Sequence, residues 1–299
     1  MADTDTTDTG TLVPEIQPGV PRARRRGAGS AAVGTGRAGT WLLRLIALFY
    51  LAFLLIIPVG LVFWRTFENG VAPVWEALTS DNALHAFRVT LVVAGCAVLF
   101  NAIFGIVAAF LLVRHEFRGK WLLDKFIDLP LAVSPVVVGL ALILVYGRNT
   151  TVGSWFSEQG FDIIYAVPGM VLATCFVSLP LMVREITPIL EEIGDEQEQA
   201  AATLGATPFQ TFRRITLPAI RWGVAYGIVL TLARSLGEFG AIAVVSGKIV
   251  GETQTLTLFV EQNFENFNQE AAYAAAFALA AMAILALLLM NLFRPREGS

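Results

Sequence analysis

Arg234 and Glu238 are the two residues of this chain whose types and spacing come nearest to chemistry. They lie four residues apart inside an apolar stretch, so a continuous helix would bring the guanidinium and the carboxylate together on one face. We consider two roles for the pair. Either it lines or gates a path on which Arg234 attracts an oxyanion, or it is an internal ion pair that fixes helix packing. Because a path has to release its anion, we do not expect Arg234 to be a strong binding site.

The sequence contains no set of side chains with the types and spacing of an active site. An intramembrane enzyme that uses Glu238 or Asp128 as an acid or base is an alternative from another class, but neither carboxylate has a second catalytic group at a suitable spacing. The chain has no GxxxxGK[ST] phosphate loop, no nucleophile elbow and no cluster with metal-ligand spacing. The two cysteines and two histidines form no common site: Cys96, Cys175, His85 and His115. We predict no catalytic residue, no metal and no cofactor.

The composition places the chain among membrane proteins. Of its 299 residues, 56% are hydrophobic and 15% are charged, and the mean hydropathy is +0.66, whereas soluble domains carry about 25% charged residues. Six apolar segments are long enough, or nearly so, for the ~20-residue helix that crosses a bilayer. They are 41–64, 89–113, 126–146, 163–183, 222–245 and 271–293. We predict an all-α membrane protein with six transmembrane helices, preceded by a disordered tail at residues 1–40.

The distribution of basic residues predicts the orientation of these helices. With the N-terminus in the cytoplasm, sixteen of the 21 Lys and Arg residues fall on the cytoplasmic side and four on the outer side, with Arg234 inside a span. Cytoplasmic loops of membrane proteins carry such an excess of positive charge. We therefore expect a multi-pass protein of the cell membrane with both termini in the cytoplasm, and no binding of nucleic acid by its basic tail.

The connection between the fourth and fifth segments is polar and helix-forming. It reads QAAATLGATPFQTFRRITLP from residue 199 to residue 218. Asp195 and Glu198 have the spacing of a capping box at the start of a helix, and Gly205 is suited to end that helix. A second capping box, Thr207 with Gln210, starts another helix, which we expect to stop near residue 218. The sequence thus predicts a rigid helical hairpin on the cytoplasmic side.

The hairpin resembles the EAA loop of bacterial ABC-type permease subunits. Ala200-Ala201, Gly205, Ile215 and Leu217-Pro218 follow the spacing of that motif. In that family the loop docks in a cleft of the partner ATPase. The resemblance implies that six residues contribute to this contact: Gln199, Ala200, Ala201, Gly205, Ala206 and Phe209. Gln199 stands where the family motif opens with a glutamate, and Glu198 lies one place earlier. The resemblance therefore does not extend to the ion pair which that glutamate can make with the ATPase, although the amide of Gln199 can form a hydrogen bond.

Three longer stretches resemble the CysW-type subunits of bacterial sulfate/thiosulfate importers: residues 128–147, 166–190 and 233–256. The most specific part is GEFG followed by SGKIVGETQTL, and molybdate/tungstate permeases have a similar sequence there, so these oxyanions are the alternative substrates. The resemblance implies a type I ABC importer permease fold with a coupling-helix hairpin. It also implies a first transmembrane helix at 41–65, a transmembrane domain at 86–293 with its coupling loop at 184–221, and a cytoplasmic end at 294–299.

The same resemblance implies a set of partners. They are a CysT-type permease subunit, an ATP-binding subunit in two copies and an external or periplasmic sulfate-binding protein, so ATP hydrolysis belongs to a partner and this chain is not an enzyme. A passive channel or secondary transporter is a further alternative, but it leaves the hairpin without a role. Asn101 and Ser134 are lesser candidates for a polar path, and for each we favour a helix–helix hydrogen bond.

Overall fold

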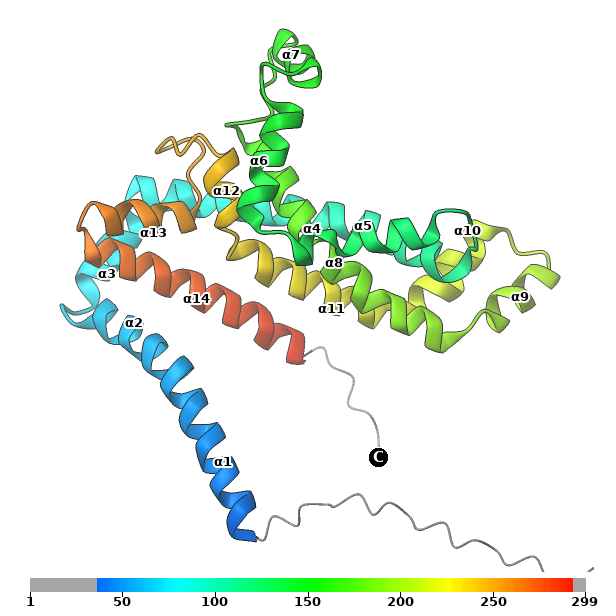
Figure 1. Cartoon of the computed structure of the whole chain (residues 1–299), viewed down its shortest axis with the longest axis horizontal. Helices are drawn as coiled ribbons and strands as arrows, with labels where there is room; N and C mark the ends of the chain where they lie inside the picture. Colours follow the sequence, from blue (N-terminus) through cyan, green and yellow to red (C-terminus); the bar gives the residue numbers. More distant parts are fainter. Residues whose placement is uncertain (1–36, 293–299) are drawn as a thin grey trace, which may run out of the picture. The chain divides into compact units, whose positions relative to one another are not determined.

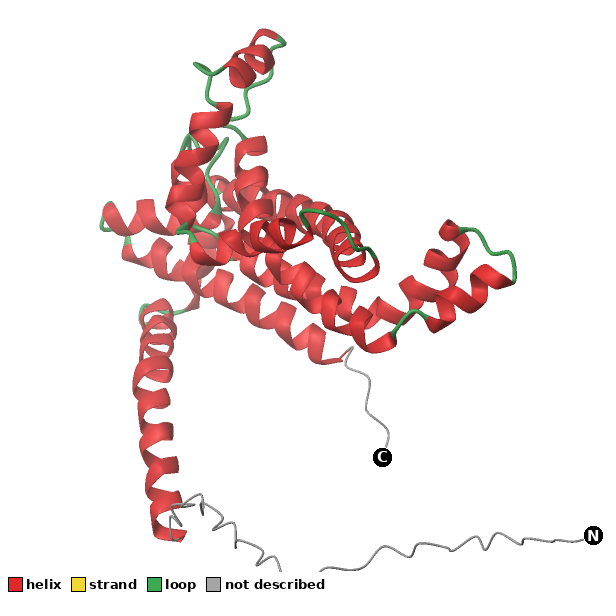
Figure 2. Cartoon of the chain, turned by 45° about the vertical axis from the view of Figure 1, so that its right-hand side comes forward, coloured by secondary structure: helices red, strands yellow, loops and turns green. Residues whose placement is uncertain are grey.

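The computed structural model describes residues 37–292, and within this range every regular element is a helix (Figures 1 and 2). The residue contacts divide the chain into two units, with the division between Phe53 and Leu54. Helix α1 (Arg37–Leu51) belongs to the first unit, and a π-helical turn, η1 (Ala52–Ile56), leads to α2 (Ile57–Phe67). Residues 1–36 of the predicted tail lie outside the described residues, and so does the predicted end at 294–299. Residues 37–40, predicted as part of the disordered tail, are instead the first turn of α1.

Four long helices form the centre of the second unit. They are α4 (Asp81–Arg114), α8 (Val167–Ile193), α11 (Leu217–Leu236) and α14 (Gln269–Leu292). Helix α4 packs against α8 and α11, and α11 also packs against α8 and α14. Glycines permit the close approach of these helices, because a Cβ on Gly105 or Gly227 would overlap the side chain of Met182. The predicted all-α fold is confirmed.

The third predicted span, 126–146, is not one straight helix. It divides into α5 (Lys120–Ala132) and α6 (Pro135–Tyr146), which are bent by 117°. Val133 and Ser134 have extended backbones, and Ser134 precedes Pro135, whose ring disfavours a helical residue before it. Five described helices are therefore long and apolar enough to cross a membrane, or six if this bent pair counts as one span.

The fifth predicted span, 222–245, is also interrupted. Helix α11 ends at Leu236, and α12 begins only at Gly240 (Gly240–Val245). A Cβ on Gly240 would lie 3.1 Å from Pro135, and one on Gly139 would lie 2.8 Å from Val244, so α12 packs closely against α6 (Figure 1). The break in α11–α12 therefore lies beside the break in α5–α6.

The remaining helices are short. They are α3 (Val71–Thr79), α7 (Thr151–Glu158), α9 (Glu196–Thr203), α10 (Pro208–Thr211) and α13 (Leu256–Glu265). The fourth span was predicted at 163–183, but α8 begins at Val167 and continues to Ile193. Its last ten residues thus belong to the segment that the sequence predicted as part of the coupling loop.

Candidate functional site

The turn between α9 and α10 has the geometry that the sequence predicts for Gly205. This residue has φ +83°, and the backbone N–H groups of Ala206 and Gly205 donate to the carbonyls of Ala201 and Ala202, each at 3.0 Å. This is the Schellman arrangement that ends a helix with a left-handed glycine. A Cβ on Gly205 would meet nothing within 4 Å, so the backbone conformation, and not the space, requires glycine there.

The second capping box is confirmed, but the expected stop at Pro218 is wrong. The backbone N–H of Thr207 donates to Gln210 Oε1 at 2.9 Å, and that of Gln210 donates to Thr207 Oγ1 at 3.3 Å. The helical run then continues through the π-helical turn η2 (Phe212–Thr216) into α11. Proline lacks the N–H that bonds four residues back, and a π-helical register change just before Pro218 accommodates that loss.

The first predicted capping box, Asp195 with Glu198, does not form. The Asp195 side chain caps no backbone N–H and instead accepts a hydrogen bond from Gln199 Nε2 at 2.8 Å. Glu198 is paired with Arg114 at 3.0 Å and accepts a hydrogen bond from the Thr216 hydroxyl at 2.7 Å. Arg114 was not among the functional residues predicted from the sequence. The sequence does carry one signal for Arg114, which is a basic residue at the C-terminal end of a long helix.

The turn of the hairpin exposes two large apolar side chains. Helices α9 and α10 contain no buried residue, and Leu204 and Phe209 are 89% and 70% exposed. Of the residues assigned to an ATPase contact, four are exposed and two are half-buried: Gln199, Ala200, Gly205 and Phe209, and then Ala201 and Ala206. Exposed apolar side chains on a capped, well-defined turn are typical of a docking surface.

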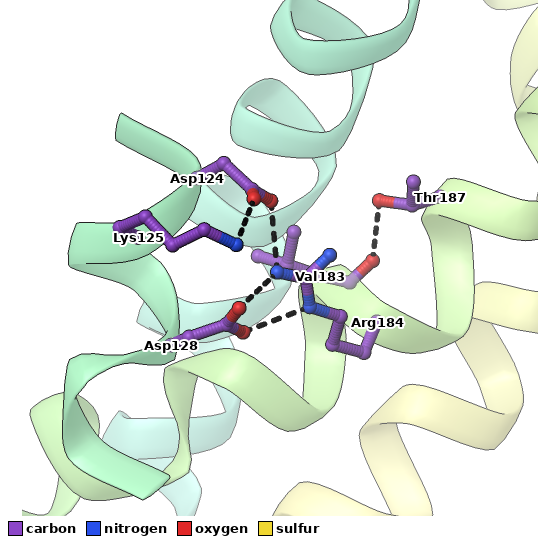
Figure 3. A network of polar contacts seen from close by, with 6 residues as sticks. All are labelled: Asp124, Lys125, Asp128, Val183, Arg184 and Thr187. Atoms are coloured by element: carbon purple, nitrogen blue, oxygen red, sulfur yellow. Dashed lines mark hydrogen bonds and ion pairs between the residues drawn. The ribbon is translucent and has the colours of Figure 1, made fainter. Parts of the chain in front are cut away.

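Asp128 is held in an ion network at the same end of α8. Arg184 Nε donates to Asp128 Oδ1 at 2.9 Å, and its Nη2 donates to Asp124 at 2.8 Å, as Figure 3 shows. Lys125 also bonds to Asp124, at 3.1 Å. The network joins α5 to α8, and it occupies the carboxylate that the enzyme hypothesis would need as an acid or base.

Arg234 and Glu238 form the predicted ion pair, although they do not share one continuous helix. Arg234 Nη1 lies 2.7 Å from Glu238 Oε2, without the alignment of a hydrogen bond. Glu238 follows the end of α11; its Oε1 accepts from the backbone N–H of Ala241 at 3.0 Å, and its carbonyl accepts from the Thr257 hydroxyl at 3.0 Å. The Glu238 side chain is 1% exposed and that of Arg234 39%. Glu238 therefore holds α12 and α13 to α11, while part of the Arg234 side chain remains accessible.

The two lesser polar candidates differ in their surroundings. Asn101 Nδ2 donates to Ser178 Oγ at 2.8 Å and to the Cys175 carbonyl at 3.1 Å, which confirms a helix–helix hydrogen bond between α4 and α8. Ser134 is exposed at the 117° bend, and its side chain makes no such bond within residues 37–292. Ser134 is the residue that precedes α6, and its side chain does not cap that helix.

Known proteins resemble the chain in sequence and in fold. The family model of binding-protein-dependent transport system inner membrane components matches residues 101–298. A Synechocystis protein named sulfate transport system permease protein CysW is 48% identical over 258 residues, which cover 86% of this chain and 94% of that protein. The Escherichia coli K12 protein named sulfate transport system permease protein CysT is 34% identical over 252 residues, which cover 84% of this chain and 91% of that protein.

A solved structure supports the fold alone, because the sequence identity is 20%. It is the crystal structure of a bacterial alginate ABC transporter in complex with a periplasmic protein that carries an alginate pentasaccharide. The matched chain superimposes with a TM-score of 0.72 over 86% of this chain and 94% of its own length. The arrangement of helices is thus that of an ABC transporter permease.

Proposed function

We propose that this chain, which belongs to the family of binding-protein-dependent transport system inner membrane components, is the permease subunit of an ATP-driven sulfate/thiosulfate importer. The observation that carries the proposal is the 48% identity to a sulfate permease along nearly its whole length. The second relative is a sulfate permease as well, which favours sulfate over the molybdate/tungstate alternative. The chain is a non-catalytic translocation subunit.

The hairpin is the surface that receives the force of ATP hydrolysis. Its capped turn at Gly205 is rigid, and Leu204 and Phe209 are exposed. In this proposal six residues of the hairpin dock in a cleft of a separate ATPase, of which the importer holds two copies: Gln199, Ala200, Ala201, Gly205, Ala206 and Phe209. Closure of the ATPase pair on ATP draws the hairpins together and turns the cavity between the permease subunits outward.

The other partners lie in the membrane and outside it. A CysT-type permease pairs with this chain around the central path, and an external sulfate-binding protein delivers the anion. The excess of Lys and Arg on one side supports an orientation in which the hairpin and both termini are cytoplasmic. Segment 246–257, at the opposite end of α8 and α11, then faces outward.

Arg234 is the candidate gate of the path. Its side chain is half-exposed beside two neighbouring helix breaks, and its pairing with Glu238 moderates the attraction for a dianion. Broken helices whose ends meet inside the membrane are typical of transporter pathways. Glu238 acts here as a support, because both of its oxygens and its carbonyl have contacts within the fold.

Uptake by cells tests the proposal. Cells that lack this chain are supplied with radiolabelled sulfate, with and without the intact gene restored, and with molybdate as the competitor. We expect sulfate uptake to return with the gene and molybdate to compete poorly. If molybdate uptake depends on the chain and sulfate uptake does not, the substrate assignment is wrong and the alternative in the same family holds.

A further inference from the structure

One guanidinium joins the ends of three helices at the base of the hairpin. Arg114, the last residue of α4, donates from Nη1 to the Leu190 carbonyl at 3.0 Å and from Nη2 to the Gly194 carbonyl at 2.6 Å. Both carbonyls belong to the end of α8. Its Nε donates to Glu198 Oε2, in the first turn of α9, at 3.0 Å. The side chain of Arg114 is only 10% exposed, so water screens these bonds little.

Glu198 extends this network to a fourth element. Its Oε1 accepts a hydrogen bond from the hydroxyl of Thr216, the last residue of η2, at 2.7 Å, and Thr216 is 3% exposed. The charges suit the helix dipoles, since Arg114 lies at the C-terminal ends of α4 and α8 and Glu198 at the N-terminal end of α9. Hydrogen bonds between ionised groups are among the stronger ones in proteins.

Helix α4 is not a neighbour of the hairpin along the chain. The backbone leads directly from α8 into α9 and from η2 into α11, but 84 residues separate Arg114 from Glu198. A ring contact between Phe110 and Phe212, with centroids 6.0 Å apart, also links α4 to the hairpin. Between α8 and α9 the backbone passes through Gly194 at φ +69°, a position at which glycine gives no rigidity of its own.

We propose that Arg114 and Glu198, with Thr216, are positioning residues that fix the hairpin to the bundle, so that a displacement of the hairpin moves α4 together with α8 and α11. This inference rests on the proposed function, since it concerns the hairpin that receives the ATPase. Without these bonds the ATPase still docks and hydrolyses ATP, but the hairpin passes its displacement to α4 only through the backbone connections to α8 and α11 and the contact between Phe110 and Phe212. Less of the displacement then reaches the end of α4. The network thus determines coupling and not docking.

The test uses the full complex in lipid vesicles, with the ATPase and the binding protein present. Glu198→Gln and Arg114→Met are compared with Glu196→Gln, which removes an exposed carboxylate from the same turn of α9. The measured quantity is sulfate taken up per ATP hydrolysed. We expect Glu198→Gln and Arg114→Met to lower this ratio about tenfold, a typical effect for losing the coupling between two sites, with normal co-purification of the ATPase and no change in Glu196→Gln.

A second measurement separates coupling from folding. Spin labels are placed at Thr203→Cys on α9 and Arg118→Cys just beyond α4, in a background without the two native cysteines. We expect a narrow distance distribution in the otherwise unmodified chain, with and without ATP, and a broad one when Glu198→Gln is added. Equal widths, or a coupling ratio equal to that of Glu196→Gln, would overturn the inference. If the wild-type complex takes up no sulfate, the proposed function fails instead, and the distance measurement alone decides on the network.

Discussion

The hairpin and segment 246–257 lie at opposite ends of α8 and α11. Both are rich in polar residues, which are mostly exposed in the hairpin and partly buried in segment 246–257. In segment 246–257 the Ser246 hydroxyl donates to the Thr253 carbonyl at 2.6 Å, and the backbone N–H of Leu256 donates to Thr90 Oγ1 at 2.8 Å. Residues 253–256 are all buried, whereas α9 and α10 contain no buried residue. Segment 246–257 is thus held by buried hydrogen bonds of its own, whereas the surface of α9 and α10 is exposed.

The largest expected effect is on sulfate uptake, and it distinguishes two glycines with nearly the same backbone conformation. Gly205 in the hairpin has φ +83° and Gly251 in the opposite segment has φ +80°, and a Cβ on either would meet nothing within 4 Å. A left-handed conformation costs a residue with a Cβ roughly 1–2 kcal/mol, so valine distorts both turns similarly. We expect Gly205→Val to abolish sulfate uptake in cells with normal membrane insertion, and Gly251→Val to retain uptake. Equal uptake by the two variants would remove the hairpin from the mechanism.

A phenylalanine at each end sharpens the comparison at the level of binding. Phe209 is 70% exposed in the hairpin, and Phe161 is half-exposed at the opposite end. A buried aromatic anchor contributes about 2 kcal/mol to an interface, which is about 30-fold in affinity. We therefore expect Phe209→Ser to weaken ATPase binding by about that factor and Phe161→Ser to leave it unchanged, as measured by titration of the ATPase onto the permease in lipid nanodiscs. An unaffected Phe209→Ser would show that the hairpin docks through other residues.

A valine in place of threonine at each of the two ends, at Thr90 and at Thr203, has a smaller effect, which is on stability alone. Thr90→Val leaves the buried backbone N–H of Leu256 without its acceptor, at a cost of about 1–3 kcal/mol. Thr203→Val removes an exposed hydroxyl that donates to the Ala200 carbonyl at 2.7 Å, and we expect a change within about 0.5 kcal/mol. Thermal unfolding in detergent measures both. A Tm that falls equally in the two variants would contradict the view that Thr90 makes a buried bond to segment 246–257 whereas the bond of Thr203 in α9 is exposed to solvent.

The smallest effect concerns the exposed pair of Arg148 and Asp162, near segment 246–257. The hydrogen bond from the Arg148 guanidinium lowers the pKa of Asp162. A lowered pKa in the folded state stabilises the fold above the ordinary pKa of aspartate, and this contribution is lost as the pH falls through the folded-state value. We expect Asp162→Asn to reduce the Tm slightly at pH 7, by an amount that shrinks as the pH falls below the ordinary pKa of aspartate and disappears below the folded-state pKa, and to leave uptake unchanged. A difference in Tm that persists at low pH would rule out this pairing as its cause.

Local signals in the sequence predicted much of this architecture. The lengths of the apolar segments indicated the membrane helices, and Gly205 with the Thr207–Gln210 capping box defined the turn of the hairpin, because such caps depend on residues within one helical turn. The breaks at Ser134 and Glu238 escaped prediction, since hydropathy does not change where the backbone is interrupted. Arg114 was missed because its partner Glu198 lies 84 residues away and the pairing depends on the fold.

ATP-driven uptake into lipid vesicles is the most direct test of the central claim. The purified chain is reconstituted with its CysT-type partner and the ATPase, ATP is supplied to the side of the hairpin, and labelled sulfate with its binding protein is supplied to the other side. The account predicts sulfate accumulation against its gradient that requires ATP and is lost in Gly205→Val. Sulfate movement that is independent of ATP, or accumulation that Gly205→Val leaves intact, would contradict it.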